Sequence, residues 1–225
     1  MINLDLFKIY TFNDCKKIRL GSNNDGGYVI IENIGSYDFL ISGGAGSNTT
    51  FEKCLTEKYK IFGLIVDDKA NTLPHSNTYL TLIKCTIDKI NNLVNYFENY
   101  KDIFLKIDIE GFEYDLFSNW TDQDFLRIKQ MVIEFHYPYS ESKMEILKKI
   151  IKNHTILHFH ANNCCGCINI NDISMPKVFE ITAVRNDTFL DKQITQSSVN
   201  LPTEIDQKNV VKNPDIILDY PPFIL

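Results

Sequence analysis

Several features that would assign this chain to a protein class are missing from it. It has no run of about 18 apolar residues, the length that a membrane helix needs, and its start lacks the basic and then apolar segments of a secretory signal. We therefore expect a cytoplasmic protein with no membrane partner. With 23 basic against 29 acidic residues, the net charge of −6 argues against a large nucleic-acid-binding surface. The chain contains no internal repeat.

Two glycine-rich nucleotide motifs are also absent. The sequence has neither the G-x-G-x-x-G of dinucleotide sites nor a Walker loop, which disfavours a nicotinamide-dependent oxidoreductase. The composition is that of an ordinary soluble protein, with 44% hydrophobic and 23% charged residues. A chain of 225 residues is long enough to form one domain with a full hydrophobic core. The six cysteines are expected to be free thiols in an intracellular chain.

The most informative stretch is residues 38–51. Its apolar run ends at Gly43, Gly44 and Gly46, and a helical pattern then continues to about residue 59. Thr49 and Glu52 have the spacing of a capping box, which predicts the start of that helix. A strand, a glycine turn and a helix N-terminus let a ligand approach backbone N–H groups, although a plain connection that needs small residues is the simpler alternative.

Further strands and helices alternate along the chain. The strand at 60–66 ends in Asp67, which follows the glycines by about the 20 residues that separate glycines and ribose-binding acid in doubly wound folds. Thr86 is predicted to cap a helix over 87–97, and Ser142 with Glu145 to open another. We predict the other strands near 78–84, 102–108, 130–136, 154–160 and 177–185. This alternation indicates a mainly parallel sheet covered by helices on both faces, with ligands at the carboxyl ends of its strands.

Acids and histidines follow the later strands at those same ends. The candidates for catalysis are Asp108, Glu110, Glu134, His136 and His160. Helix capping is the alternative role for the first two. Glu134 is harder to explain structurally, because a buried carboxylate without a partner is costly.

The motifs Leu-Lys-Ile-Asp-Ile-Glu-Gly (105–111), Phe-Glu (51–52), Met-Val-Ile-Glu-Phe-His (131–136) and Asp-Gly-Gly-Tyr-Val (25–29) resemble the FkbM-like S-adenosylmethionine-dependent methyltransferases, as do pieces at 160–163 and 176–182. The resemblance covers residues 19–185. It implies the α/β class I methyltransferase fold: a Rossmann-like seven-stranded sheet, mainly parallel, with an antiparallel last strand. It also implies O-methylation of a small molecule, often a sugar, sugar nucleotide or glycan.

The resemblance also assigns the cofactor, S-adenosyl-L-methionine, to particular positions. The residues it implies are Gly43, Gly44 and Gly46 for the methionine part, Asn48 in the same loop, Asp67 for the ribose and Thr86 for the adenine side. One departure is that the first strand ends in Ser42, where many relatives have an Asp or another longer polar group. How the amino group of the cofactor is held is therefore open.

An alcohol is a poor nucleophile at neutral pH, so methyl transfer to it needs a base or a metal ion. In one scheme His136 or His160 is the general base. In the other, Asp108 and Glu134 bind a divalent ion, for which Mg²⁺ suits oxygen ligands, and Glu110 or a histidine takes the proton. A zinc site of histidines 154, 158 and 160 with the Cys-Cys-Gly-Cys loop (164–167) is geometrically conceivable, but a metal-free loop fits its spacing better.

The chain divides, on composition, into an N-terminal cap at 1–35, a methyltransferase domain at 36–186 and an extended arm at 187–225. The arm is polar and carries four prolines, so residues 200–225 are expected to lie outside the core, as a wrapping segment, a lid or a contact for a homo-oligomer. A catalytically inactive methyltransferase-like binding domain is the alternative function. A crevice plugged by the arm would favour that alternative.

Overall fold

The computed structural model describes residues 2–70, 72–73, 78–97 and 99–225. Its centre is a seven-stranded sheet in the order β6-β5-β4-β7-β8-β12-β9. The strands are β4 (Phe39–Gly43), β5 (Gly63–Val66), β6 (Leu80–Ile83), β7 (Ile103–Ile107), β8 (Ile128–His136), β9 (His154–Ala161) and β12 (Val178–Arg185). Pairs from β6 to β8 are parallel, whereas β12 runs antiparallel to β8 and β9. The predicted class I methyltransferase sheet with an antiparallel last strand is confirmed.

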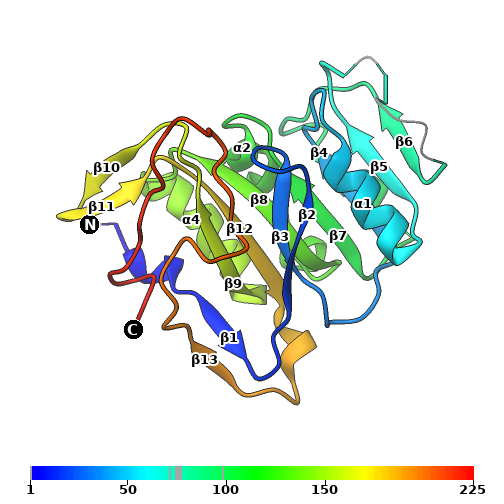
Figure 1. Ribbon diagram of the computed structural model, residues 1–225. Coiled ribbons are helices and arrows are strands. Elements are labelled where there is room, and N and C mark those ends of the chain that lie inside the picture. The colour runs from blue at the N-terminus through cyan, green and yellow to red at the C-terminus, as the bar shows by residue number, and fades with distance from the viewer. Residues whose placement is uncertain (1, 71, 74–77, 98) are drawn as a thin grey trace.

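Helices cover both faces of this sheet (Figure 1). One face packs against α2 (Glu113–Ser118), α3 (Asp122–Phe125) and α4 (Glu141–Asn153), with Phe117 and Phe125 fully buried beneath them. The opposite face packs against α1 (Thr50–Tyr59) and the hairpin of β2 (Lys17–Gly21) and β3 (Gly27–Ile31). The N-terminal segment therefore closes one side of the core rather than extending from it.

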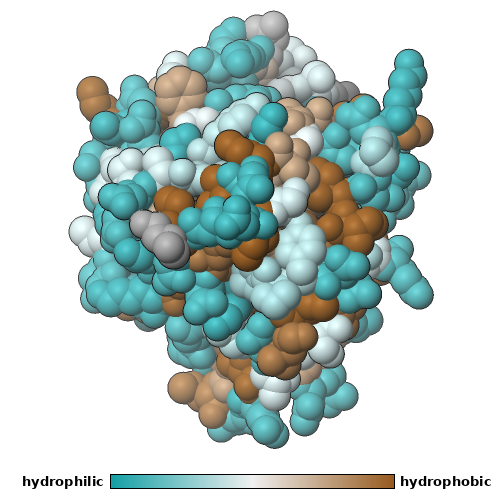
Figure 2. Space-filling model, turned by 90° about the vertical axis from the view of Figure 1, so that its left-hand side faces the viewer, coloured by the Kyte–Doolittle hydropathy of each residue, from teal (hydrophilic) through white to brown (hydrophobic). Residues whose placement is uncertain are grey.

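Smaller elements complete the fold at its edges. β1 (Tyr10–Phe12) pairs with β13 (Ile194–Gln196), and β10 (Cys167–Ile170) pairs with β11 (Ile173–Pro176). Short 3-10 turns occur at Leu4–Phe7, Val94–Tyr96 and Asn186–Phe189. Figure 2 shows the side on which β10 and β11 lie in Figure 1, where apolar side chains form separate patches among hydrophilic ones, as is usual for protein surfaces.

Three local predictions are wrong. No α-helix forms over 87–97, because the Asp88 side chain accepts hydrogen bonds from the backbone N–H groups of Ile90 and Asn91 and stabilises a turn instead. Thr49 precedes α1 as predicted, but its side chain makes no capping bond, and the Glu52 carboxylate accepts from Ser42 instead of completing a capping box. The cap of α4 is Ser140, two residues before the predicted Ser142.

The arm contributes to the core, so the expectation that residues 200–225 lie outside it is wrong. Leu201, Leu218 and Phe223 are buried, and the Phe223 ring lies 4.8 Å from that of Phe159 on β9. A polar anchor adds to them, because Asp206 Oδ1 lies 2.8 Å from His158 Nε2 and both side chains are buried. In Figure 1 the arm, orange to red, passes across β9 and β12.

The cysteines depart in part from the free-thiol expectation. Cys164 and Cys165 are joined by a disulfide, whereas cysteines 15, 54, 85 and 167 are free. Of the three histidines in the zinc alternative, His154 contacts the Ile128 carbonyl, His158 contacts Asp206 and His160 contacts Glu180. Within the described ranges, no cysteine belongs to a group of side chains that could hold a metal ion, and no helix is long and apolar enough to cross a membrane.

Candidate active site

The glycine turn after β4 is shaped by a close backbone contact. Gly44 has φ +74°, and a Cβ there would lie 1.8 Å from the carbonyl oxygen of Asp108. The end of β4 therefore abuts the end of β7, and only glycine fits at this position. Gly46 also has a positive φ of +55°, but a Cβ there would meet nothing within 4 Å.

Asp67 holds this turn in place with both carboxylate oxygens. Oδ2 accepts from the N–H groups of Ala45 at 2.8 Å and Gly46 at 2.7 Å. Oδ1 accepts from those of Lys69 at 2.7 Å and Ala70 at 2.8 Å. Burial raises the pKa of Asp67, but these four hydrogen bonds outweigh it and leave the pKa lowered. A carboxylate has about four acceptor positions, so all of those on Asp67 are in use.

A cavity of about 430 Å³ opens beside the turn. It is bounded by residues 44–48, 66–69, 85–87 and 108–110, together with Asp25 and Phe112. The cofactor residues implied by the resemblance that line it are Gly44, Gly46, Asn48, Asp67 and Thr86, whereas Gly43 is buried at the strand end and does not. Asp68, which sequence reasoning passed over, lines the cavity with an exposed side chain and accepts from Thr86 Oγ1 at 3.3 Å.

Strand register places three of the predicted catalytic residues, Asp108, Glu134 and His160, in one row. Ile107 on β7 pairs with Ile133 on β8, so Asp108 follows directly beside Glu134. Glu134 pairs with Glu180 on β12, which in turn pairs with His160 on β9. Opposite residues share a face of the sheet, so the row runs from the cavity wall at Asp108 to His160. Glu180 was not among the predicted site residues, although its position on an antiparallel strand would have placed it here.

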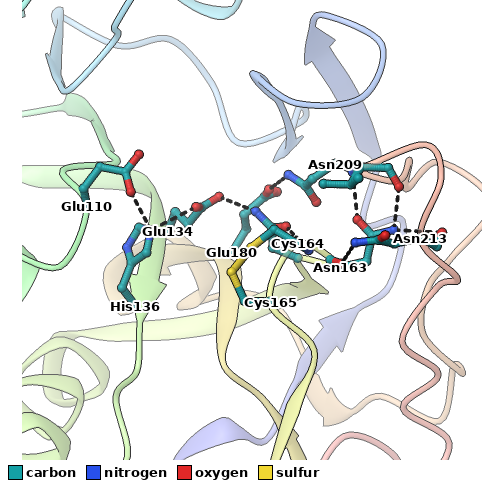
Figure 3. Close-up of a disulfide and its surroundings, with 11 residues drawn as sticks. Glu110, Glu134, His136, Asn163, Cys164, Cys165, Glu180, Asn209 and Asn213 are labelled. Atoms are coloured by element: carbon teal, nitrogen blue, oxygen red, sulfur yellow. Dashed lines mark hydrogen bonds and ion pairs between the residues drawn. A yellow bond between two sulfur atoms is a disulfide. The ribbon is translucent and has the colours of Figure 1, made fainter.

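His136 lies among three carboxylates, of which Figure 3 shows those of Glu134 and Glu110. Its Nε2 is 3.3 Å from Glu134 Oε1 and 3.5 Å from Glu110 Oε2, and its Nδ1 is 3.0 Å from Glu113 Oε1. Burial lowers the pKa of His136, but these partners prevail and raise that pKa to about 10. With this pKa the imidazole is protonated at neutral pH and has no free lone pair.

Glu134, in contrast to His136, is a group that can accept a proton. Burial, together with the charges of Asp108 and Glu180, raises its pKa to about 7 in spite of the hydrogen bond to His136, which lowers it. Its other oxygen accepts from Asn162 Nδ2 at 3.2 Å. Glu134 is thus a carboxylate that can take up a proton near neutral pH.

Asp108 is held from the other side by two residues that sequence reasoning did not place in the site. Tyr28 Oη donates to Asp108 Oδ2 at 2.9 Å, and Lys106 Nζ lies 3.8 Å from the same oxygen. Both come from the motifs quoted for the family resemblance, at Asp-Gly-Gly-Tyr and Leu-Lys-Ile-Asp, but only the register of the sheet and hairpin brings them to Asp108.

His160 lies at the far end of the row. Its Nδ1 is 3.3 Å from Glu180 Oε2, and Asn209 of the arm donates to Glu180 Oε1 at 2.9 Å. Glu180 therefore separates His160 from Glu134. Of the acids predicted for catalysis, Asp108 and Glu110 line the cavity and Glu134 does not, and no described residue of the arm lines it.

Comparison with known structures finds several distant similarities. A chain from the crystal structure of a fibrillarin/Nop5p complex is 14% identical, with a TM-score of 0.44 over 66% of this chain and 72% of that one. A SAM-dependent methyltransferase from Archaeoglobus fulgidus is 12% identical, with a TM-score of 0.40 over 66% and 86%. Fibrillarin from Methanococcus jannaschii is 10% identical, with a TM-score of 0.43 over 77% and 83%. These similarities are too weak to indicate a substrate or a mechanism.

Comparison by sequence is more informative. No curated protein matches the chain. The model of the methyltransferase FkbM domain, however, matches residues 10–161, which is well over half of the sequence. The matched range contains the glycine turn, both walls of the cavity and the acids of β7 and β8. The chain belongs to the FkbM methyltransferase family.

Proposed function

We propose that this protein transfers a methyl group from S-adenosylmethionine to a hydroxyl of a small, sugar-like acceptor without a phosphate group. The observation that carries the proposal is the placement of Asp108 and Glu134 side by side, with Asp108 in the wall of a cavity behind a glycine turn. In parallel α/β sheets this edge is where ligands bind.

The residues around the cavity suit the cofactor. The turn at Gly44–Gly46 leaves the backbone approachable, and the cavity of about 430 Å³ is in the range of small-molecule sites. Because Asp67 is fully engaged with the turn, we assign the ribose hydroxyls to Asp68 and the adenine side to Thr86 and Ile87. When bound, the cofactor supplies an electrophilic methyl group on a sulfonium.

The acids of the row suit activation of an alcohol. Glu134, with a pKa of about 7, takes the proton of the acceptor hydroxyl, and Asp108 orients that hydroxyl. The imidazolium of His136 stabilises the carboxylate form of Glu134 until the proton arrives. Glu110, whose side chain is 77% exposed, lies at the entrance to this pair.

A divalent ion is the second way to activate the hydroxyl. Ligand atoms of Asp108, Glu134 and His136 lie within 4.8 Å of one another, and two carboxylates with an imidazole are a fitting donor set. When bound, such an ion lowers the pKa of a coordinated hydroxyl. His136 would then have to release its proton to serve as a ligand.

Charge and shape around the cavity limit the acceptor. Among the described residues that line it, one is cationic, Lys69, against five carboxylates: Asp25, Asp67, Asp68, Asp108 and Glu110. A diphosphate would meet repulsion there and find no clamp of basic residues, so we favour a neutral or cationic acceptor over a sugar nucleotide. Phe112, 55% exposed at the cavity, offers an apolar ring face to a sugar.

The open cavity also favours an enzyme over a catalytically inactive binding domain, because the arm does not plug it. The test is a screen of matched acceptors with isotopically labelled S-adenosylmethionine, scored by mass spectrometry. The panel pairs each sugar or amino sugar with its phosphate or nucleotide derivative. We expect gain of a single methyl group on a member without phosphate. Turnover restricted to phosphorylated acceptors would contradict the acceptor assignment, and binding of the cofactor without any transfer would favour the binding domain.

The same assay distinguishes the two modes of activation. Turnover that stops after chelation and returns with Mg²⁺ or Mn²⁺ would identify the ion-assisted mode. Turnover that survives chelation would identify Glu134 as the unaided base.

A further inference from the structure

A small recess of about 60 Å³ lies next to the cavity and shares part of its wall. Asp25, Ala45, Asn48 and Asp108 line both spaces. The residues that line only the recess are Gly26, Tyr28, Phe51, Glu52 and Lys106. The proposed mechanism uses Asp108 but none of the residues that line only the recess.

Glu52 is buried, with 1% of its surface exposed. One carboxylate oxygen, Oε1, accepts from Ser42 Oγ at 2.7 Å. The other, Oε2, is buried and has no hydrogen-bond partner. An unpartnered carboxylate oxygen is costly to bury. Its position in the lining of a polar recess therefore indicates that a donor on a ligand completes it.

Lys106 brings the opposite charge into the same recess. Its side chain is 4% exposed, donates to the carbonyl of Gly44 and lies 4.0 Å from Glu52 Oε1. The ammonium group also lies 5.5 Å from the centre of the Tyr28 ring. The recess thus contains a buried anion and a buried cation side by side, beside the glycine turn.

The loop between β2 and β3 closes the recess. A Cβ on Gly26 would lie 2.2 Å from Asn48 Nδ2, and one on Gly27 would lie 2.1 Å from Arg19 Nη1. Arg19 donates to the carbonyls of Ser22 and Asn24, and so fixes the loop in this position. The Asp-Gly-Gly sequence and the arginine before it are explained by this close approach, which a plain hairpin would not need.

We propose that the recess binds the α-amino-acid end of S-adenosylmethionine. Glu52 accepts from the ammonium group and replaces the acid that is missing at the end of β4, where Ser42 stands. Lys106 faces the carboxylate, and the Asp25–Gly27 loop covers both. A zwitterion needs one group of each sign at close range, and the Glu52–Lys106 pair provides them. This inference rests on the proposed function, because it concerns the same cofactor.

The test compares three ligands by calorimetry. S-adenosylhomocysteine carries the whole amino-acid end, its decarboxylated analogue keeps only the ammonium group, and methylthioadenosine has neither. Glu52→Gln keeps the acceptor for Ser42 but removes the charge. We expect Glu52→Gln to weaken the binding of S-adenosylhomocysteine and of the decarboxylated analogue at least tenfold. The binding of methylthioadenosine should weaken less than twofold. Lys106→Met should weaken the binding of S-adenosylhomocysteine at least tenfold, but not that of the other two ligands. The exposed Glu57→Gln on the same helix is the matched control and should change none of them.

The outcomes separate this inference from the proposed function. Equal weakening of all three ligands by Glu52→Gln, or unchanged binding of S-adenosylhomocysteine, would overturn the role of the recess while the cavity remained a nucleoside site. Methylthioadenosine binding also reports that the variant is folded. A wild-type protein that binds none of the three ligands would overturn the proposed function, and this inference with it.

Discussion

Oε1 of Glu134 lies 3.3 Å from Nε2 of His136, and this contact joins two side chains that are both candidates for the general base. Histidine is the usual general base, but His136 is held as an imidazolium by three carboxylates. In the proposed mechanism, the buried carboxylate of Glu134, with its pKa of about 7, is therefore the group that accepts a proton at neutral pH.

Asp67 and Asp68 should respond to mutation in different ways. Asp68→Ala should weaken binding of S-adenosylhomocysteine by about 1.5–3 kcal/mol, the loss of a charge-assisted hydrogen bond, without lowering the melting temperature. Asp67→Ala leaves four backbone N–H groups without their acceptor, so it should cost at least about 2 kcal/mol of folding stability. Calorimetry and chemical denaturation measure the two effects. A stable Asp67→Ala protein with weakened binding, beside an Asp68→Ala protein with normal binding, would restore the original assignment of the ribose to Asp67.

The arm should be required for stability. Phe223 is fully buried against Phe159, so Phe223→Ala should lower the free energy of unfolding by about 3–5 kcal/mol. Leu225→Ala, at a side chain 78% exposed, is the matched control and should have little effect. Truncation after Asp191 should therefore give a destabilised or insoluble protein, measured by denaturant unfolding. A truncated protein as stable as the full chain would show that the arm is dispensable.

His154 should make the protein sensitive to acid. Burial lowers its pKa to about 4 in the folded state, below the ordinary value of 6.5. As the pH falls from about 6.5 to 4, the unfolded chain gains a proton that the folded chain does not, and stability falls by up to about 3 kcal/mol.

His154→Gln removes this proton while keeping an N–H donor for the Ile128 carbonyl, which His154 Nε2 contacts at 2.8 Å. Denaturant unfolding of both proteins between pH 7 and pH 4 should give a flatter dependence for the variant. Parallel curves for wild type and variant would argue that His154 is protonated in the folded protein.

The sequence predicts those parts of the site whose position depends only on where an apolar strand ends. β7 and the second half of β8 are mostly apolar, so their ends, and with them Asp108 and Glu134, can be located and paired from sequence. The hydrogen-bond partners of Asp67 cannot be predicted from sequence, because they depend on which way the backbone N–H groups of the turn point. The helix expected at 87–97 fails because the short side chain of Asp88 competes for backbone donors, which apolar spacing does not reveal.

The arm and the recess were missed for a related reason. The arm looks like an extended polar segment because its buried side chains are few and far apart, at Leu201, Leu218 and Phe223. Glu52 fits a capping box by spacing, but Ser42 and Lys106 draw its carboxylate into the interior. Both outcomes depend on contacts between residues distant in sequence.

The central claim is that Glu134 acts on the acceptor and does not merely support the fold. Its most direct test is single-turnover methyl transfer by Glu134→Gln, at saturating S-adenosylmethionine, with the exposed Glu204→Gln as control. We expect the variant to lose about 10²–10⁴-fold in rate, while its affinity for S-adenosylhomocysteine and its melting temperature stay close to those of wild type. A Glu134→Gln protein that transfers methyl groups at the wild-type rate per folded molecule would contradict the account.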